Sequence, residues 1–470
     1  MKTKLMKCAV MIALMLTACD SKDAVVVGAG DASEAKLDGG VPSTNNGTGK
    51  DIFPGLIGNG PTNADREAFC KGRGPSVVVP GETPVCAGKL AEKTFRYGLC
   101  TCQDVMLNGK LHTDSIDSNA GMSVANGGAS VGINGTFSNP GESRIGGSLI
   151  VKGPMGSSAS QEITGDLKVD GLLSSEGKVA VGRDAWINGF IAVTGELSVG
   201  RDLHSPSGKP LVDGARVGGN VITEPFTFSP PCDCEKPLDV TAIVNEARTN
   251  NHNALINLDP DRLALVSQPT ILELPCGRYY LSGIRGAAPI TIKITGRTAI
   301  YVGGSIEAAS SLNVDVGPQG EVDLFAEGAV FAVSGSMRLG SSDRPAASRM
   351  YLGSTSIMNI EGSGELVANI YAPRAQLIAA VSKLQIYGSL FVRGVVGSNL
   401  SVRFDRAITG AGNDCDKEIA PPTKGGECKA CGDCANYAAC IDGVCGACRT
   451  DADCCSPLIC QNGQCVVIVN

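Results

Sequence analysis

Apolar residues recur with a fixed step of 18 positions between residues 145 and 223. Each repeat opens on an aliphatic residue, passes a glycine and reaches a short apolar segment such as Leu167–Val169. The repeats start at Ile145, Ile163, Val181, Val199 and Val217. This period, with its β-branched residues and frequent glycines, predicts a mainly β fold: a parallel β-helix, whose stacked coils bury an aliphatic column that one coil could not bury alone.

Alternation within each repeat predicts which side chains point inward. We expect three inward columns, at residues 145/163/181/199/217, 149/167/185/203/221 and 151/169/187. Lys168, Trp186 and His204 fall between two of these columns, so they should point outward.

A second strand-rich run covers residues 276–410, with less regular spacing. It contains short apolar segments such as Ile290–Ile294 and Val322–Phe325. Residues 224–275 are expected to form an insertion with one helix over Leu238–Arg248. We interpret the second run as part of the same solenoid, and the sequence leaves open whether the two runs form one continuous helix.

Two resemblances support a β-helix. Gly165–Gly171 and Gly195–Val199 resemble the short Gly-x-Val-x-Val units of bactofilins, which are polymer-forming β-helical proteins. The pair Ile370–Pro373 and Ile386–Gly388 resembles an uncharacterised β-helical domain of bacterial surface and pilus-associated proteins. That resemblance implies a fold and a cell-surface setting, and no reaction.

The N-terminus predicts export. Lys2, Lys4 and Lys7 precede an apolar stretch that ends in Leu16-Thr-Ala-Cys19. This ending resembles the lipobox of bacterial lipoproteins, which implies that Cys19 carries lipid and attaches the chain to a membrane. An ordinary signal peptide is the alternative. The expected location is the cell envelope, at the outer membrane or cell surface, with the choice of membrane left open.

These patterns divide the chain into eight segments. We predict a signal peptide (1–18), a flexible tether (19–66), a small cysteine-stapled cap (67–120), the 18-residue repeats (121–223), the insertion (224–275), the second β-helical run (276–410), a linker (411–427) and a cysteine-rich module (428–470).

Cysteine usage fits an oxidising compartment. Of 20 cysteines, Cys8 leaves with the signal peptide and Cys19 carries lipid, and the even remainder predicts disulfides. We expect two bridges within the cap, among Cys70, Cys86, Cys100 and Cys102. We expect Cys415 to pair with one of Cys232, Cys234 and Cys276.

The C-terminal module is dense in cysteine. Its ten cysteines are Cys428, Cys431, Cys434, Cys440, Cys445, Cys448, Cys454, Cys455, Cys460 and Cys465. The module resembles small knottin-like and Dickkopf-type modules, which are mostly extracellular and bind proteins. Disulfides are the favoured interpretation, and zinc bound by two CxxC pairs is the alternative.

Charge narrows the choice of partners. The net charge is −7, and it becomes −10 once Lys2, Lys4 and Lys7 leave with the signal peptide. This balance argues against nucleic acid and against anionic lipid headgroups. Glycans and other envelope proteins remain candidate partners, and we expect no cofactor.

Catalytic signals are absent from the sequence. It contains no HExxH, P-loop or GxGxxG motif, and His112, His204 and His252 lie far apart. Asp166, Asp184 and Asp202 occupy equivalent places in successive repeats. We interpret them as a solvated ladder beside arginines, with a calcium site as the alternative.

A second acidic cluster bears on enzymatic function. Glu321, Asp323 and Glu327 lie on one strand or just beyond it. We expect an exposed polar strand face, whereas a polysaccharide lyase or hydrolase would use such acids as a catalytic pair. The sequence thus predicts a non-catalytic envelope protein with a binding, adhesion or structural role. The alternatives are a surface polysaccharide lyase or hydrolase and a self-assembling envelope scaffold.

Overall fold

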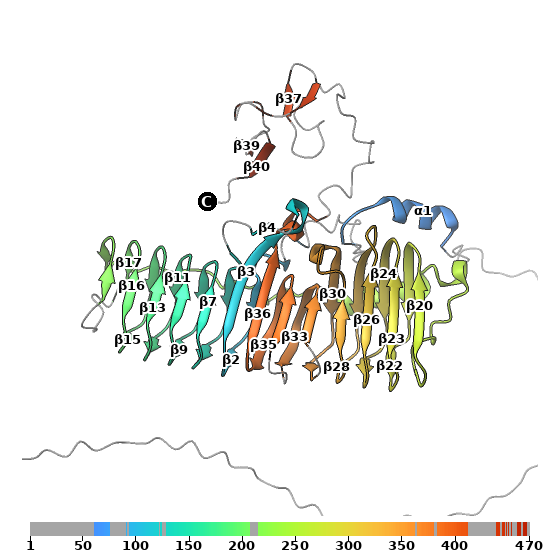
Figure 1. The fold of residues 1–470 in the computed structure, drawn as a ribbon, viewed down its shortest axis with the longest axis horizontal. Helices are drawn as coiled ribbons and strands as arrows, with labels where there is room; N and C mark the ends of the chain where they lie inside the picture. Colours follow the sequence, from blue (N-terminus) through green and yellow to red (C-terminus); the bar gives the residue numbers. More distant parts are fainter. Residues whose placement is uncertain are drawn as a thin grey trace, which may run out of the picture. The chain divides into compact units, whose positions relative to one another are not determined.

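The computed structural model describes a β-helix flanked by two α-helices, together with parts of the C-terminal module. The described residues are 61–75, 91, 94–121, 123–124, 128–206, 215–361, 364–379, 383–411, 439–441, 444–446, 448, 450, 453, 458–461 and 464–467. The predicted lipid site, Cys19, lies outside them. The strands are stacked in parallel, so the predicted parallel β-helix is confirmed (Figure 1).

Each coil has three sides, which we call face 1, face 2 and face 3. In the N-terminal run, face 1 consists of β1 (Leu99–Thr101), β5 (Val131–Ile133), β8 (Leu149–Val151), β11 (Leu167–Val169), β14 (Ala185–Ile187), β17 (Leu203–His204) and β19 (Val221–Ile222). Face 2 consists of β2 (Val105–Leu107), β6 (Phe137–Asn139), β9 (Met155–Ser157), β12 (Leu173–Ser175) and β15 (Ile191–Val193). Face 3 consists of β3 (Leu111–Asp117), β7 (Ser143–Ile145), β10 (Gln161–Ile163), β13 (Val179–Val181), β16 (Leu197–Val199) and β18 (Arg216–Val217), and β4 (Ser123–Val124) pairs antiparallel with β3.

The second run repeats this plan with longer strands. Its face 1 contains β21 (Gly277–Leu281), β24 (Arg297–Val302), β27 (Glu321–Ala326) and β30 (Ser348–Leu352), and its face 2 contains β22 (Ile284–Gly286), β25 (Ile306–Ala308), β28 (Val330–Val333) and β31 (Ile357–Ile360). Two long strands, β33 (Asn369–Ala379) and β35 (Leu390–Gly397), turn the corner and belong to both faces. Face 3 contains β20 (Thr270–Leu274), β23 (Ile290–Ile294), β26 (Leu312–Val316), β29 (Met337–Leu339), β32 (Gly364–Val367), β34 (Leu384–Tyr387) and β36 (Leu400–Asp405).

The predicted columns are found in the core. Ile163 pairs with Ile145 on one side and Val181 on the other, and all three side chains are buried. Successive strands of the regular coils begin six residues apart, so an 18-residue coil is three six-residue sides. Aliphatic side chains from all three sides fill the interior, which buries them from water and stabilises the stack.

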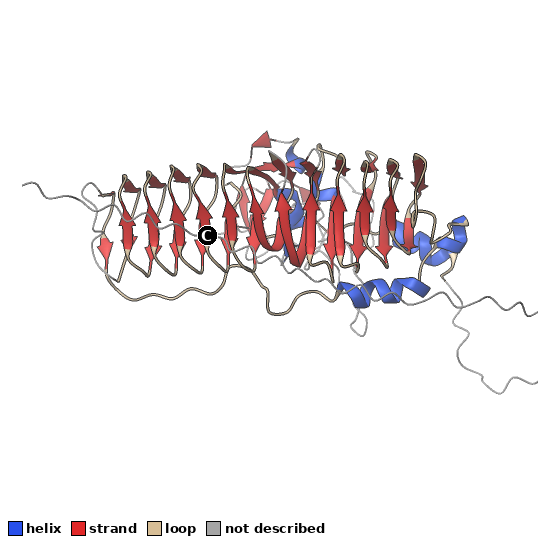
Figure 2. Cartoon of the chain, turned by 90° about the horizontal axis from the view of Figure 1, so that it is seen from below, coloured by secondary structure: helices blue, strands red, loops and turns tan. Residues whose placement is uncertain are grey.

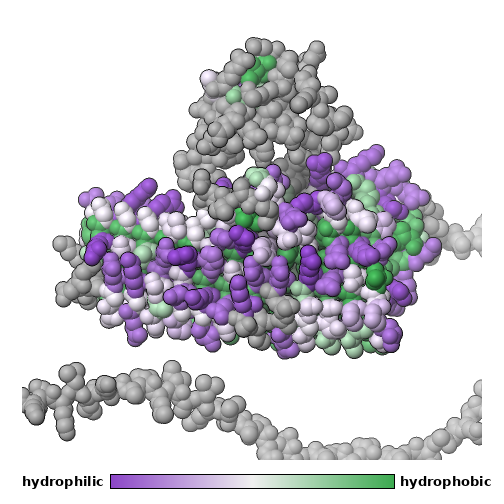
Figure 3. All heavy atoms as spheres, viewed as in Figure 1, coloured by the Kyte–Doolittle hydropathy of each residue, from purple (hydrophilic) through white to green (hydrophobic). Residues whose placement is uncertain are grey.

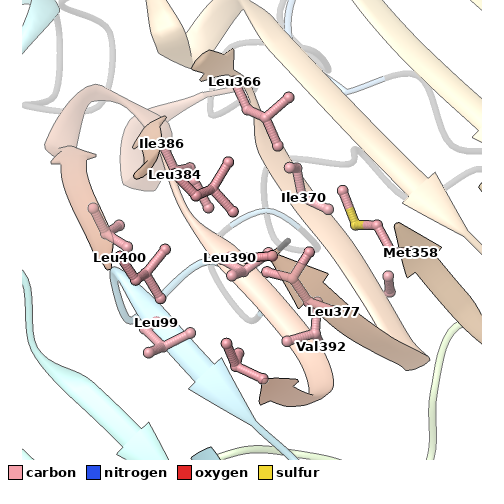
Figure 4. Close-up of a cluster of buried hydrophobic side chains, with 14 of the residues drawn as sticks. Leu99, Met358, Leu366, Ile370, Leu377, Leu384, Ile386, Leu390, Val392 and Leu400 are labelled. Atoms are coloured by element: carbon pink, nitrogen blue, oxygen red, sulfur yellow. The ribbon is translucent and has the colours of Figure 1, made fainter. Parts of the chain in front are cut away.

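The two runs form one continuous β-helix, in an order that differs from the chain order. The last coil of the second run stacks on the first coil of the N-terminal run: β36 pairs with β3, and β35 pairs with β1 and β2. The core is continuous across this junction, where Leu99 lies close to Leu390 and Leu400 (Figure 4). Residues 99–117 are therefore a coil of the β-helix, and the separate cap expected over 67–120 is wrong for this part.

The insertion is a connector that returns along face 1. Its helix α3 (Val240–Thr249) is capped by Asp239 and buries Val240, Ile243 and Val244. These side chains pack on an outward row of rings, Tyr280, Tyr301, Phe325, Tyr351, Tyr371 and Phe391. Neighbouring rings stack with centroids 5.2 and 4.8 Å apart around Phe325. The N-terminal helix α1 (Asn63–Lys71) contacts β21 and β24 of the same run.

Disulfides fix these covering segments. Cys100 bonds to Cys232 and Cys102 to Cys234, which holds the connector on the junction coil. Cys70 bonds to Cys276, which holds α1 at the start of the second run. The expected local bridges within the cap are therefore wrong. The reason is that Cys100 points outward from β1 toward the connector rather than toward its sequence neighbours.

The expected pairing of Cys415 is also wrong, since Cys232, Cys234 and Cys276 have other partners. Cys86 and Cys415 themselves lie outside the described residues, as do Cys428, Cys431, Cys434, Cys454 and Cys455. In the C-terminal module, β37 (Ala439–Ile441) and β38 (Val444–Gly446) form one hairpin, and β39 (Leu458–Gln461) and β40 (Gln464–Val467) form another. Cys440 and Cys448 are disulfide-bonded.

Candidate functional site

The three faces of the β-helix differ in what covers them. In the second run, face 1 lies under the connector and α3, which bury its aromatic row. The described outward residues of face 3 are mostly polar and at least partly exposed, and hydrophilic side chains are spread over this face (Figure 3). Ligand sites are usually concave and carry a few fixed polar groups, and face 3 is the face that offers such groups.

A hollow of about 760 Å³ lies on face 3 at the junction of the two runs. Its polar lining comes from both runs: Lys110, His112, Glu142, Ser143, Arg144, Ser160, Glu162, Lys383, Asn399 and Ser401. Five of these residues directly precede the face-3 strands of five successive coils. The hollow therefore follows one corner of the β-helix across the junction.

Strand register sets the rest of the lining. His112 on β3 lies between Ser401 on β36 and Arg144 on β7, and Glu162 on β10 follows Arg144. These side chains point outward because the alternate residues of the same strands are buried. At the corner itself, the backbone N–H of Lys110 donates to Oδ1 of Asn399 (2.7 Å) and so joins the two runs.

Charges of both signs line the hollow. Lys110 Nζ lies 3.0 Å from Glu142 Oε2, and Arg144 Nε lies 3.0 Å from Glu162 Oε2. Both pairs are exposed, so each adds little to stability and stays accessible to a ligand. Lys383 makes no ion pair with any residue that the structure describes.

The three histidines are not brought together. His112 lines the hollow, whereas His204 stacks on Trp186 on face 1 at 4.9 Å between ring centroids. Lys168 Nζ lies 4.7 Å from the ring centroid of Trp186, so Trp186 contacts both Lys168 and His204. This row points outward, as predicted. His252 is buried beside Phe69. Burial lowers the pKa of His252 to about 4.

Asp166 and Asp184 accept hydrogen bonds from the backbone of the next coil. The backbone N–H of Asp184 donates to Asp166 Oδ1 (3.3 Å), and that of Asp202 donates to Asp184 Oδ1 (3.0 Å). Arg183 lies 3.1 Å from Asp166. Each carboxylate thus caps the next coil, and across the described part of the chain no three potential metal ligands converge.

In the second acidic cluster Asp323 is buried and Glu321 and Glu327 are half-buried, so the expected exposed strand face is wrong. Asp323 is 0% exposed and accepts two hydrogen bonds from Arg349 (2.5 and 3.1 Å), which is 1% exposed. Arg349 also lies 2.9 Å from Glu321. Burial raises the pKa of Asp323, and Arg349 opposes that shift. Asp323 is held by a structural ion pair, which leaves it unsuited to a catalytic pair.

The hollow could not be predicted from the sequence. Lys110 and Asn399 are 289 positions apart, and no sequence pattern signals that their coils are neighbours. The nearest local signal is the pair of corner glycines: a Cβ on Gly141 would lie 1.9 Å from the carbonyl oxygen of Gly109, so this corner needs glycine.

None of the helices within the described residues is long and apolar enough to cross a membrane.

Comparison with known proteins identifies one region. No curated protein and no solved structure matches this chain. Residues 234–411 match the family model described as a domain of unknown function, DUF7305. The matched range begins at the connector cysteine Cys234 and includes α3 and all strands of the second run. The chain thus contains a DUF7305 domain, on whose last coil the N-terminal 18-residue repeats are stacked.

Proposed function

We propose that this chain is a non-catalytic binding protein of the cell envelope, and that the junction hollow holds an extended, hydroxyl-rich polymer such as a polysaccharide. The observation that carries the proposal is the lining of the hollow. Hydrogen-bond donors and acceptors are both present along five successive coils, which are about 4.8 Å apart. A repetitive ligand can make equivalent contacts at each coil.

The mixture of charges favours hydroxyl groups as the recognised chemistry. A hydroxyl both donates and accepts hydrogen bonds, so it can bind Glu142 and Glu162 as well as Lys110 and Arg144. A polyanion would meet the two carboxylates at close range, and the net charge of −7 would oppose its approach.

Envelope location has two supports. Disulfides persist in oxidising compartments, so the bonds of Cys70, Cys100 and Cys102 indicate an extracytoplasmic protein. The lipid anchor on Cys19, and attachment at the outer membrane or cell surface, belong to the proposal and rest on the lipobox resemblance. Metabolic labelling with a radioactive fatty acid tests it, since Cys19→Ser would abolish the label.

Binding is tested by titrating the purified protein with cell-wall polysaccharides in a calorimeter. Arg144→Ala and Lys383→Ala remove donors from the hollow, and we expect each to weaken binding about 10-fold, since hydrogen bonds to charged groups contribute about 1.5–3 kcal/mol. Lys293→Ala is the matched control, because Lys293 forms an equivalent face-3 ion pair with Glu273 outside the hollow. Equal effects of all three variants would remove the hollow as the site.

One observation favours a second candidate, a polysaccharide hydrolase or lyase. Glu142 and Glu162 line the same hollow, and glycoside hydrolases use two carboxyl groups. This candidate predicts release of new chain ends from a bound polysaccharide, and loss of that release in Glu162→Gln. Binding without new ends supports the non-catalytic role.

A further inference from the structure

Face 2 carries an outward row without charge. Strand register places nine residues in this row: Ala332, Asn359, Ile378, Val396, Met106, Ser138, Gly156, Ser174 and Ala192. The row crosses the junction and becomes charged only at Glu307 and Arg285, near the start of the second run. Figure 2 views the β-helix from below, the side on which Figure 1 places the strands of face 2.

Exposed apolar side chains gather on the same face. Eight large hydrophobic side chains are exposed among the described residues, and six of them lie on face 2 or its edge: Met106, Leu172, Phe190, Ile357, Ile378 and Val396. Phe190 is 70% exposed and Val396 is 43% exposed. Scattered apolar residues on a surface need no explanation, but their concentration on one uncharged face indicates an interaction surface.

We propose that face 2 binds face 2 of a second copy, so that two β-helices lie side by side. Flat sheet faces pack against each other about 10 Å apart. Another β-helix has the same coil spacing, so the uncharged side chains of one copy can fit between those of the other along the row. A symmetric contact through one shared patch is the commonest way in which identical chains associate.

The distribution of charge favours face 2 as the region through which two copies make contact. Each copy has a net charge of −7, so like-charged surfaces repel when two copies approach. On face 3, ion pairs such as Arg144–Glu162 and Lys293–Glu273 are exposed and hydrated. The face-2 row contains no charged residue, so two copies can make contact there without desolvating an ion.

The size of the face sets the expected strength. Nine coils about 4.8 Å apart, with strands about 10 Å long, give a flat area of about 400 Å² per copy. This is about half of what a stable interface buries per partner. We therefore expect a weak, reversible dimer that requires high local concentration. This inference goes beyond the proposed ligand site and does not depend on it.

Sedimentation over a wide range of concentrations tests the proposal on the purified full chain. The expected result is reversible dimerisation. Val396→Lys places a charge in the middle of the row and should raise the dimer Kd at least 10-fold. Ile271→Lys is the matched control: Ile271 is 57% exposed on β20, away from face 2, and its substitution should leave the Kd unchanged.

The outcomes separate clearly. A native chain that stays monomeric at every concentration overturns the proposal, as does an equal effect of Val396→Lys and Ile271→Lys. Circular dichroism of each variant establishes that it is folded, and Ile378→Lys gives a second, independent charge in the row. Arg144→Ala should dimerise normally, so loss of polysaccharide binding and loss of dimerisation can be told apart.

Discussion

The backbone N–H of Lys110 donates a hydrogen bond to the side chain of Asn399 (2.7 Å) across 289 positions of sequence. Lys110 precedes the first long strand of the N-terminal run, and Asn399 precedes the last strand of the second run. Their contact marks the junction at which the two runs become one β-helix. The hollow, the twin disulfides and the middle of the uncharged face-2 row all lie on coils at or next to this junction.

The junction core should be essential for stability. Leu400 is 2% exposed and contacts the first coil, so Leu400→Ala should lower the free energy of unfolding by about 2–5 kcal/mol. Leu265→Ala is the control, since Leu265 is 86% exposed and its loss should cost under about 0.5 kcal/mol. Urea denaturation measures both. Similar values for the two variants would show that the runs do not share a core.

The twin disulfides should act as one constraint. Cys100–Cys232 and Cys102–Cys234 both close a loop with a sequence separation of 132, and they are two residues apart at each end. Once one bridge is closed, the other removes little further chain entropy. We expect Cys100→Ser with Cys232→Ser to cost well under 2 kcal/mol. Removal of both bridges should cost about 2–5 kcal/mol in the same denaturation assay, and additive losses would refute this.

Stability should fall in mild acid because of His252. Its Nδ1 accepts the backbone N–H of Arg278 (3.0 Å), which requires the neutral ring, and burial lowers its pKa from 6.5 to about 4. Between these two values the unfolded chain binds a proton that the folded chain does not. Stability due to His252 is thus complete above about pH 6.5 and is lost as the pH falls toward 4, by up to about 3 kcal/mol.

Denaturation at several pH values measures this dependence. His252→Gln should flatten the profile between pH 4 and 6.5, relative to the native chain. His112→Gln is the control, because His112 is exposed in the hollow and its substitution should leave the profile unchanged. An unchanged slope in His252→Gln would assign the acid sensitivity to other groups.

Removal of one partner of the buried ion pair should lower the stability of the fold strongly. Arg349→Met leaves Asp323 buried without its partner, which should cost about 3–5 kcal/mol. Replacement of both residues, by Arg349→Met with Asp323→Leu, should recover much of that loss. The buried carboxylate is removed together with its partner, and Glu321 keeps Arg297 as a partner 3.8 Å away. Thermal unfolding of the single and double variants measures the recovery, and a double variant no more stable than Arg349→Met would contradict it.

The regular coils could be predicted from sequence because their pattern is local. The 18-residue step placed Ile145 and Ile163 in one buried column and Trp186 in the outward row, and the structure has both. The neighbours of Cys100 could not be predicted in this way. A coil edge pairs with any coil of the right spacing, so a periodic pattern does not specify which run adjoins which.

The acidic residues show a second limit. Alternation correctly places Asp323 on the outer side of its strand, and an outer side usually faces water. Here Arg349 lies beside it one coil further on, and other segments cover the strand, so the outer side is buried. Covering segments are distant in sequence and leave no periodic signal on the strand that they cover.

The reversed order of the two runs has a consequence for biosynthesis. The N-terminal coils leave the ribosome first. One edge of β1, β2 and β3 stays unpaired until its partners, within residues 390–405, have been made. Unpaired strand edges recruit other chains, so the interval is one of exposure to misassembly. The β-helix can therefore close only after most of the chain has been synthesised, and the open strand edge has to be protected from other chains until then.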